Sequence, residues 1–180
     1  MKKRMKTYAK ICKEMDAIFQ FCAQYNKLSK PMVCGTARIR IICEHLNSIR
    51  TEIFSIIQKE SLPNLDSTIS WGNGNFPRVP WVAFHVLGKK VSNSLSVAMC
   101  FSKDGRGVVI GLMSATGLRV EMETIKRTSQ EHFLDVSGSQ KTSYNNKFIN
   151  PKEFFSETLD IEDIISHIST SLDLLYSHNK

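Results

Sequence analysis

The sequence predicts one domain of the α/β class, in its α+β form, with a small, mostly antiparallel sheet packed by two N-terminal helices and a C-terminal helix. Apolar residues recur with helical spacing in residues 1–60 and again in 160–177, whereas 66–150 holds short β-prone runs between turns. A length of 180 residues is usual for one domain, and 42% apolar residues can supply a core.

Three helices are expected. Apolar residues from Tyr8 to Tyr25 repeat at steps of three and four, as one face of a long helix does. The segment around Pro31 ends that helix, and Thr36 is a candidate N-cap for a second helix that ends near Lys59. The last helix follows Asp160, which is its candidate N-cap.

The middle of the chain predicts strands and loops. Lys103–Gly107 is expected to form a hairpin loop, with glycine available for positive φ. Glu121–Phe133 is expected as a short helix and Ser137–Asn150 as a polar loop segment. The four predicted strands are Thr68–Trp71, Trp81–Leu87, Leu95–Phe101 and Val108–Met113.

The charge is unevenly distributed. Residues 1–60 hold twelve basic and five acidic side chains, 61–130 hold eight and four, and 131–180 hold four and eight, for a net charge of +7. An excess of Lys and Arg over the first 130 residues suits a polyanionic partner, because each contact with a phosphate releases a counterion. Ordinary solvated lysines are the alternative explanation.

Composition also indicates the cellular setting. No apolar run approaches the ~18–20 residues that a membrane span needs, and Met-Lys-Lys-Arg leads into an amphipathic helix rather than a signal peptide, so we expect a cytoplasmic protein. The cysteines form no Cys-x-x-Cys pair and are expected to be buried free thiols rather than disulfides or metal ligands. They are Cys12, Cys22, Cys34, Cys43 and Cys100.

No constellation of catalytic residues is convincing. Ser137–Thr142 ends in Lys-Thr but lacks the spacing of a phosphate-binding loop, and the Gly-x-Ser-x-Gly, His-Glu-x-x-His and nuclease Pro-Asp…Glu-x-Lys patterns are missing. Carboxylates near the last helix could be called a metal cluster, but they suit the helix dipole better. They are Glu153, Glu157, Asp160, Glu162 and Asp163. We therefore predict a binding module without a metal or cofactor.

The most unusual segment lies between Trp71 and Trp81, where two glycines, two asparagines and two prolines follow a predicted strand. The glycines permit backbone angles closed to other residues and would present the asparagines at a tight exposed loop. This loop is formed by Gly72, Asn73, Gly74 and Asn75. A simple corner between strands, with both tryptophans in the core, is the alternative.

The pattern Ser-x-Gly-x-Gly-Asn-Phe-x-x-x-Pro-Trp-x-Ala-Phe, which begins at Ser70, resembles the hallmark of the McrB N-terminal DNA-recognition domain family of modification-dependent, type IV restriction systems. The similarity is strong over residues 70–113, and Leu174–Tyr176 also fits the family, whereas the first 60 residues match only in being helical. The resemblance implies binding of duplex DNA with a modified base, commonly methylated cytosine, that flips into a pocket.

The resemblance also assigns residues to that pocket. Trp81 falls on the pocket wall, and Ser96 and Cys100 fall on two further pocket positions, where they are smaller than the family's residues. Tyr144 is expected to supply an aromatic wall that is otherwise missing. Asn73 in the loop would fill the space that the flipped base leaves, where the best-known relative has an aromatic residue.

Partners follow from the same resemblance. Basic residues flanking the sheet would hold phosphates, and a nucleotide-driven (GTPase) motor and a separate nuclease subunit would act with the chain, although neither motif is present in it. The alternatives are a reader of N6-methyladenine, of unmodified DNA or of RNA, an oligomerisation domain, and a nuclease. The predicted phosphate-binding residues are Arg78, Lys89, Lys90, Lys103 and Arg106, with Lys126 and Arg127 nearby.

Overall fold

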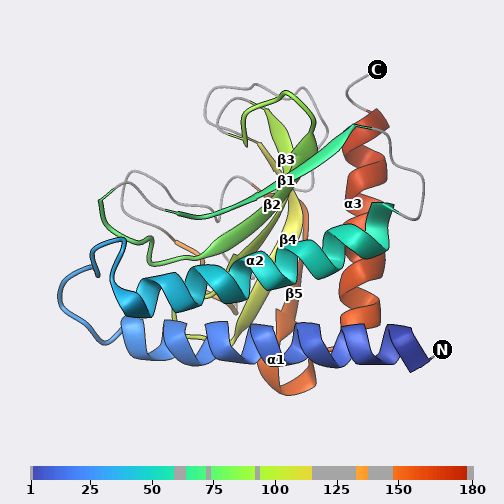
Figure 1. The fold of residues 1–180 in the computed structure, drawn as a ribbon. Helices are drawn as coiled ribbons and strands as arrows, with labels where there is room; N and C mark the ends of the chain where they lie inside the picture. Colours follow the sequence, from blue (N-terminus) through green and yellow to red (C-terminus); the bar gives the residue numbers. More distant parts are fainter. Residues whose placement is uncertain are drawn as a thin grey trace.

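The computed structural model describes residues 2–58, 64–71, 74–91, 94–114, 133–137 and 148–177. These residues form three α-helices and one antiparallel sheet, so the predicted α+β class is confirmed (Figure 1). The helices are α1 (Lys2–Tyr25), α2 (Ala37–Ile57) and α3 (Ile161–Ser177). The strands are β1 (Leu65–Ile69), β2 (Trp81–Val86), β3 (Leu95–Phe101), β4 (Gly107–Ser114) and β5 (Phe148–Phe155), and a 3-10 turn, η4, covers Ser156–Thr158.

The sheet is a meander in which each strand pairs with the next along the chain, in the order β1-β2-β3-β4-β5. The sequence predicted four strands and assigned the start of β5 to a polar loop, which is wrong. Pro151 and the charged residues after it interrupt the β-prone pattern of the sequence. Proline is nevertheless compatible with β5, because β5 lies at the edge of the described sheet, where a residue without an N–H is tolerated. A register shift in β4 lies opposite, where a Cβ on Gly111 would come within 2.9 Å of the Pro151 Cα.

One face of the sheet packs against all three helices. The apolar stripes predicted for the helices are the faces that they bury, and every second residue of the strands points toward them. Residues that meet in this core include Met15, Ile18, Leu46, Ile49, Phe84, Met99, Ile110, Ile168 and Leu172. In Figure 1, α1 and α2 run side by side across the sheet, and α3 crosses near the N-terminal end of α1 and the C-terminal end of α2.

Both predicted N-caps are confirmed. The Ile39 N–H donates to Thr36 Oγ1 at 3.4 Å at the start of α2. At the start of α3, the N–H groups of Glu162 and Asp163 donate to Asp160 Oδ1 at 2.9 and 3.3 Å. These bonds satisfy N–H groups that the first turn of a helix leaves unpaired, and they fix where each helix begins.

The opposite face of the sheet carries a second, smaller apolar cluster. Strand residues that alternate with those of the main core contribute to it, together with two residues of the segment 133–137. Its members are Val79, Ala98, Cys100, Val109, Met113, Leu134, Val136 and Phe148, and Trp81 packs partly buried against them. This face is therefore free of the three helices.

The cysteines are all free thiols, as expected, but burial is incomplete. Cys22, Cys43 and Cys100 are buried, whereas Cys12 and Cys34 are half-buried. Burial raises the pKa of the Cys22 thiol to about 12, so that this thiol stays protonated at neutral pH. Among the described helices, none is long and apolar enough to cross a membrane.

Candidate nucleic-acid interface

A clamp between Ser70 and Trp81 closes the loop of residues 71–80. The two residues exchange hydrogen bonds, because the Ser70 N–H donates to the Trp81 carbonyl at 2.9 Å and the Trp81 N–H donates to Ser70 Oγ at 3.0 Å. Ser70 is buried and directly follows β1, and Trp81 begins β2. The loop therefore starts and ends on two paired strands, with Trp81 at its base.

The loop is also tied to the α1–α2 connection, by which we mean residues 26–36. Val33 and Asn75 form an isolated antiparallel bridge. The Cys34 N–H donates to the Gly74 carbonyl at 2.8 Å, and the Phe76 N–H donates to the Met32 carbonyl at 2.8 Å. Two segments about forty residues apart in sequence thus run together as a short ladder.

Tyr25, the last residue of α1, holds both segments of this ladder through its hydroxyl group. Its buried hydroxyl donates to the Phe76 carbonyl at 2.7 Å and accepts from the Met32 N–H at 3.0 Å. The guanidinium of Arg78 lies 4.5 Å from the centre of the Tyr25 ring and donates to the carbonyls of Tyr25 and Leu28. Arg78, predicted to bind phosphate, thus already binds carbonyls at the C-terminal end of α1.

Part of the predicted insertion loop can be described. Gly74 has a φ of +83°, the left-handed conformation that the glycine-rich pattern indicates, and Asn75 is exposed beside it. Gly72 and Asn73 lie outside the described residues. Trp71 is 62% exposed and follows the end of β1, so the alternative that places both tryptophans in the core is wrong for Trp71.

The predicted pocket residues share the face of the second cluster. Trp81 lies directly across from Cys100 in the pairing of β2 with β3. Ser96 lies on the same face four residues back along β3, roughly 13 Å away at the usual rise of a strand. The structure thus brings Trp81 and Cys100 together and places Ser96 farther along the same face. Tyr144 lies outside the described residues.

Small side chains occupy the face between these positions. Ala83 pairs with Ala98, which lies between Ser96 and Cys100 on β3, and Ala98 pairs with Gly111 on β4. The Ser96 hydroxyl oxygen is buried and has no hydrogen-bond partner among the described residues. A buried hydroxyl without a partner costs free energy, and such a group is a candidate for contact with a ligand.

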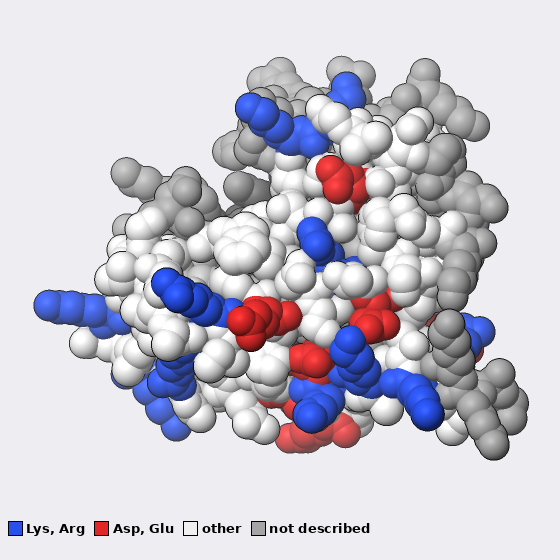
Figure 2. Space-filling view, in the orientation of Figure 1, with Lys and Arg blue, Asp and Glu red and all other residues white. Residues whose placement is uncertain are grey.

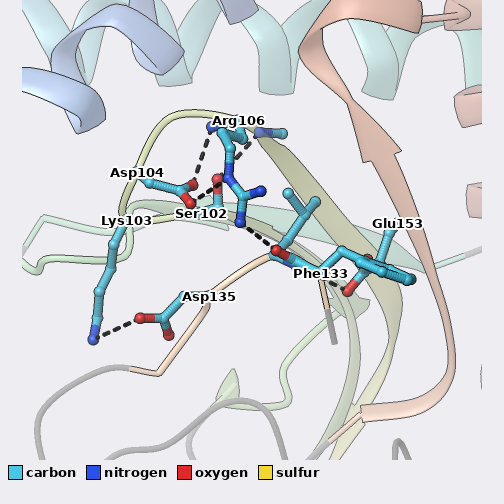
Figure 3. A network of polar contacts seen from close by, with 9 residues as sticks. Ser102, Lys103, Asp104, Arg106, Phe133, Asp135 and Glu153 are labelled. Atoms are coloured by element: carbon cyan, nitrogen blue, oxygen red, sulfur yellow. Dashed lines mark hydrogen bonds and ion pairs between the residues drawn. The ribbon is translucent and has the colours of Figure 1, made fainter. Parts of the chain in front are cut away.

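Two predicted phosphate ligands lie in a polar network at the β3–β4 hairpin (Figure 3). Arg106 Nε donates to Asp104 Oδ2 at 2.5 Å, and its other end donates to the Phe133 carbonyl. Lys103 Nζ donates to Ser137 Oγ at 2.8 Å and pairs with Asp135 at 3.4 Å. These contacts hold the segment 133–137 against the hairpin.

Two carboxylates of this network, those of Asp104 and Asp135, have lowered pKa values. Burial alone would raise the pKa of the Asp104 carboxyl, but hydrogen bonds from Arg106 and Ser102 outweigh burial and hold that pKa below its usual value. For Asp135, burial is likewise outweighed by hydrogen bonds from Ser137 and by Lys103, and its pKa is also lowered. Asp104 and Asp135 therefore neutralise much of the positive charge of Arg106 and Lys103.

Lys89 and Lys90 differ from these residues. Both are exposed in the β2–β3 connection, and neither ammonium group has a partner among the described residues. Figure 2 shows blue side chains at the top of the molecule, where Figure 1 places this connection. Lys126 and Arg127 lie outside the described part of the chain.

Several residues of the site were missed by sequence reasoning. Tyr25 was assigned only to the apolar stripe of α1, and Ser70 only to a strand. The hydroxyl of a tyrosine at the end of a helical stripe, just before a Pro-containing turn, was the available signal for Tyr25. Nothing local in the sequence indicates that Met32 and Cys34 bind the backbone of the loop.

The described residues contain no group of three or more side chains that could hold a metal ion. An open cleft of about 350 Å³ lies between α1 and the β3–β4 hairpin, on the helix side of the sheet. Its lining includes the carboxylates of Asp16 and Glu157, which repel a polyanion. The candidate interface is therefore the 71–80 loop with the sheet face beside it.

Comparison with known proteins points in the same direction. The chain is similar to the type IV methyl-directed restriction enzyme EcoKMcrB subunit of Escherichia coli (strain K12). The two are 24% identical over 128 residues, which cover 67% of this chain. No family model matches the chain.

The similarity extends well beyond the segment 70–113 on which the resemblance rests. It suggests a distant relationship to McrB, in agreement with the Trp81 pattern and the loop before it. This chain spans only 28% of the length of the EcoKMcrB subunit, so the similarity concerns one part of that protein.

Proposed function

We propose that this chain binds duplex DNA that carries a modified base and acts as the targeting module of a modification-dependent restriction system, without catalysis of its own. The similarity to a subunit named as methyl-directed carries the proposal. Methylated cytosine is the first candidate for the modified base, and N6-methyladenine is the second. A nucleotide-driven motor and a nuclease subunit would be its partners.

In this proposal the modified base flips out of the duplex and stacks on Trp81. Flipping costs a few kcal/mol of lost pairing and stacking, and stacking on an aromatic ring returns about 1–3 kcal/mol per base. Trp81 suits this role because it is half-buried at the base of the 71–80 loop and has Cys100 opposite it. Ser96 and Tyr144 would complete the pocket.

The loop Gly72–Asn75 would enter the duplex where the base has left. Asn73 would hydrogen-bond the orphaned partner base, a contact worth about 1 kcal/mol. The Ser70–Trp81 clamp supports this arrangement, since it joins the loop and the pocket wall through one backbone hydrogen bond and one hydrogen bond to the Ser70 hydroxyl. Insertion and capture of the base would then occur at neighbouring points of one rigid unit.

Base flipping is tested with 2-aminopurine placed beside the modified base. Binding of the wild-type protein should increase the 2-aminopurine emission on the modified duplex, because unstacking relieves quenching, and should increase it little on the unmodified duplex. Flat emission on a modified duplex that is demonstrably bound would contradict flipping, and the loop would then be assigned to groove contact.

One observation favours a second function. Trp71 and Val33 are 62% and 60% exposed, and Cys34, the residue after Val33, donates its Sγ to the Trp71 carbonyl at 3.0 Å. Exposed apolar side chains of this size can form a protein–protein contact. An oligomerisation domain would be favoured if sedimentation showed self-association that is insensitive to salt and if the protein had no affinity for DNA.

A further inference from the structure

The structure brings together two stretches of sequence that lack acidic residues. No Asp or Glu occurs between Asp16 and Glu44, or between Asp66 and Asp104. The first stretch contains the α1–α2 connection, and the second contains the 71–80 loop. Together they hold eight basic residues: Lys27, Lys30, Arg38, Arg40, Arg78, Lys89, Lys90 and Lys103.

The Val33–Asn75 bridge and its two flanking hydrogen bonds join these stretches side by side. The Tyr25 hydroxyl binds both at once, through Met32 and Phe76. The α1–α2 connection is therefore fixed directly beside the loop proposed to enter DNA, and a duplex engaged by that loop would pass close to it.

Lys27 and Lys30 are the cations that this connection offers. Both are exposed, and neither ammonium group is bonded to a described residue. They differ in this respect from Arg78, which is bound to carbonyls of α1 and the turn after it. Figure 2 shows only blue charged side chains at the end of the molecule where Figure 1 places the connection, and the red ones lie toward the middle.

We propose that the α1–α2 connection is a second DNA-contacting element, in which Lys27 and Lys30 bind backbone phosphates of the duplex beside the 71–80 loop. The inference rests on the proposed function, since it needs a duplex at that loop. It adds a contact that neither the loop motif nor the pocket predicts. Phosphate contacts of this kind position the protein without reading the base, so they strengthen binding to modified and unmodified duplexes alike.

The test compares the full chain with the double variant Lys27→Gln/Lys30→Gln in anisotropy titrations of labelled modified and unmodified duplexes over a range of salt concentrations. The double variant should bind both duplexes more weakly by the same factor. The slope of log affinity against log salt should become shallower by about 2, at roughly 0.9 per lost phosphate contact. Lys27→Arg/Lys30→Arg should retain the wild-type slope.

A matched control removes the same charge elsewhere. Lys6 and Lys13 are exposed on α1, 19 and 12 residues before Tyr25, which is about 28 and 18 Å at 1.5 Å per residue. Lys6→Gln/Lys13→Gln should change the slope little. If both double variants behave alike, or if the first matches the wild type, the contact is refuted. If the wild type binds both duplexes equally, modified-base recognition is refuted. The comparison of the two double variants would still decide whether Lys27 and Lys30 contact the duplex.

Discussion

Trp81 makes two kinds of contact at once. Its backbone exchanges hydrogen bonds with Ser70 at the base of the loop, and its ring packs partly buried against the second apolar cluster. A fully buried ring could not accept a base, and a fully exposed ring would not be held in place. The half-buried state of Trp81 is therefore the state that a stacking wall requires.

We expect Trp81→Ala to lose discrimination between modified and unmodified duplexes more than it loses overall affinity. In the proposed function the pocket wall acts only after the base has flipped, so the substitution would leave phosphate contacts intact. Trp81→Phe should retain most of the discrimination because it keeps an aromatic face. The measurement is the ratio of the two dissociation constants, with circular dichroism to confirm folding.

Val79→Ala is the matched control, because Val79 is fully buried in the same cluster but offers no ring for stacking. It should lower stability and leave the ratio of dissociation constants unchanged. A folded Trp81→Ala protein that discriminates like the wild type would show that Trp81 serves packing alone.

At the scale of elements, the C-terminal end of α1 and the 71–80 loop act as one unit through Tyr25. Tyr25→Phe removes a hydroxyl that bridges two backbone groups and leaves the Phe76 carbonyl and the Met32 N–H without it. We expect the free energy of unfolding, from urea denaturation, to fall by about 1–3 kcal/mol. DNA affinity should fall as well, because the loop loses its anchor.

Tyr8→Phe supplies the comparison for this change. The Tyr8 hydroxyl accepts from Arg4 Nε at 2.5 Å in a solvent-exposed contact on α1. Its loss should change the free energy of unfolding by less than about 0.5 kcal/mol, since surface contacts contribute little. Equal effects of the two substitutions would show that the Tyr25 bridge does not stabilise the loop.

The β3–β4 hairpin should lose stability in acid. The folded-state pKa of Asp104 is lowered, so its contribution is present above the ordinary value of 3.8 and is lost as pH falls through the folded-state pKa. We expect Asp104→Asn to lower the melting temperature near neutral pH, and the difference from the wild type to shrink below about pH 4. A difference that is constant with pH would exclude an ionised Asp104 as its cause.

The elements differ in how far sequence predicts them. The three helices carry their signal locally, as apolar stripes with caps at Thr36 and Asp160, and the β2, β3 and β4 runs are apolar and bounded by turns. β5 was not predicted, because Pro151 interrupts its pattern. The ladder between the α1–α2 connection and the loop depends on contacts about forty residues apart, which no local pattern encodes.

The same limit applies to the site. The glycine-rich pattern predicted the positive φ of Gly74, and the resemblance placed Trp81 and Cys100, which pair across two strands. Sequence could not show that Arg78, Lys103 and Arg106 are already engaged within the protein, because their partners lie on other elements. It therefore ranked these residues beside Lys89 and Lys90, whose ammonium groups have no partner among the described residues.

At the scale of the whole molecule, acidic and basic residues are concentrated in different parts of the chain. The acidic excess of residues 131–180 includes the carboxylates at the start of α3, and the acid-free stretches meet at the 71–80 loop. Such separation orients a protein on a polyanion before any base is read. In the proposed function, recognition of the modified base is then a difference in affinity added to a salt-dependent background of general binding.

The most direct measurement compares the affinity of the full chain for duplexes that differ at one base: cytosine, 5-methylcytosine, 5-hydroxymethylcytosine or N6-methyladenine, in otherwise identical sequence and salt. We predict tighter binding to one of the modified duplexes, weaker binding of all four as salt rises, and no strand cleavage by the protein alone with magnesium present. Equal affinity for all four duplexes, or metal-dependent cleavage by the pure chain, would contradict this prediction.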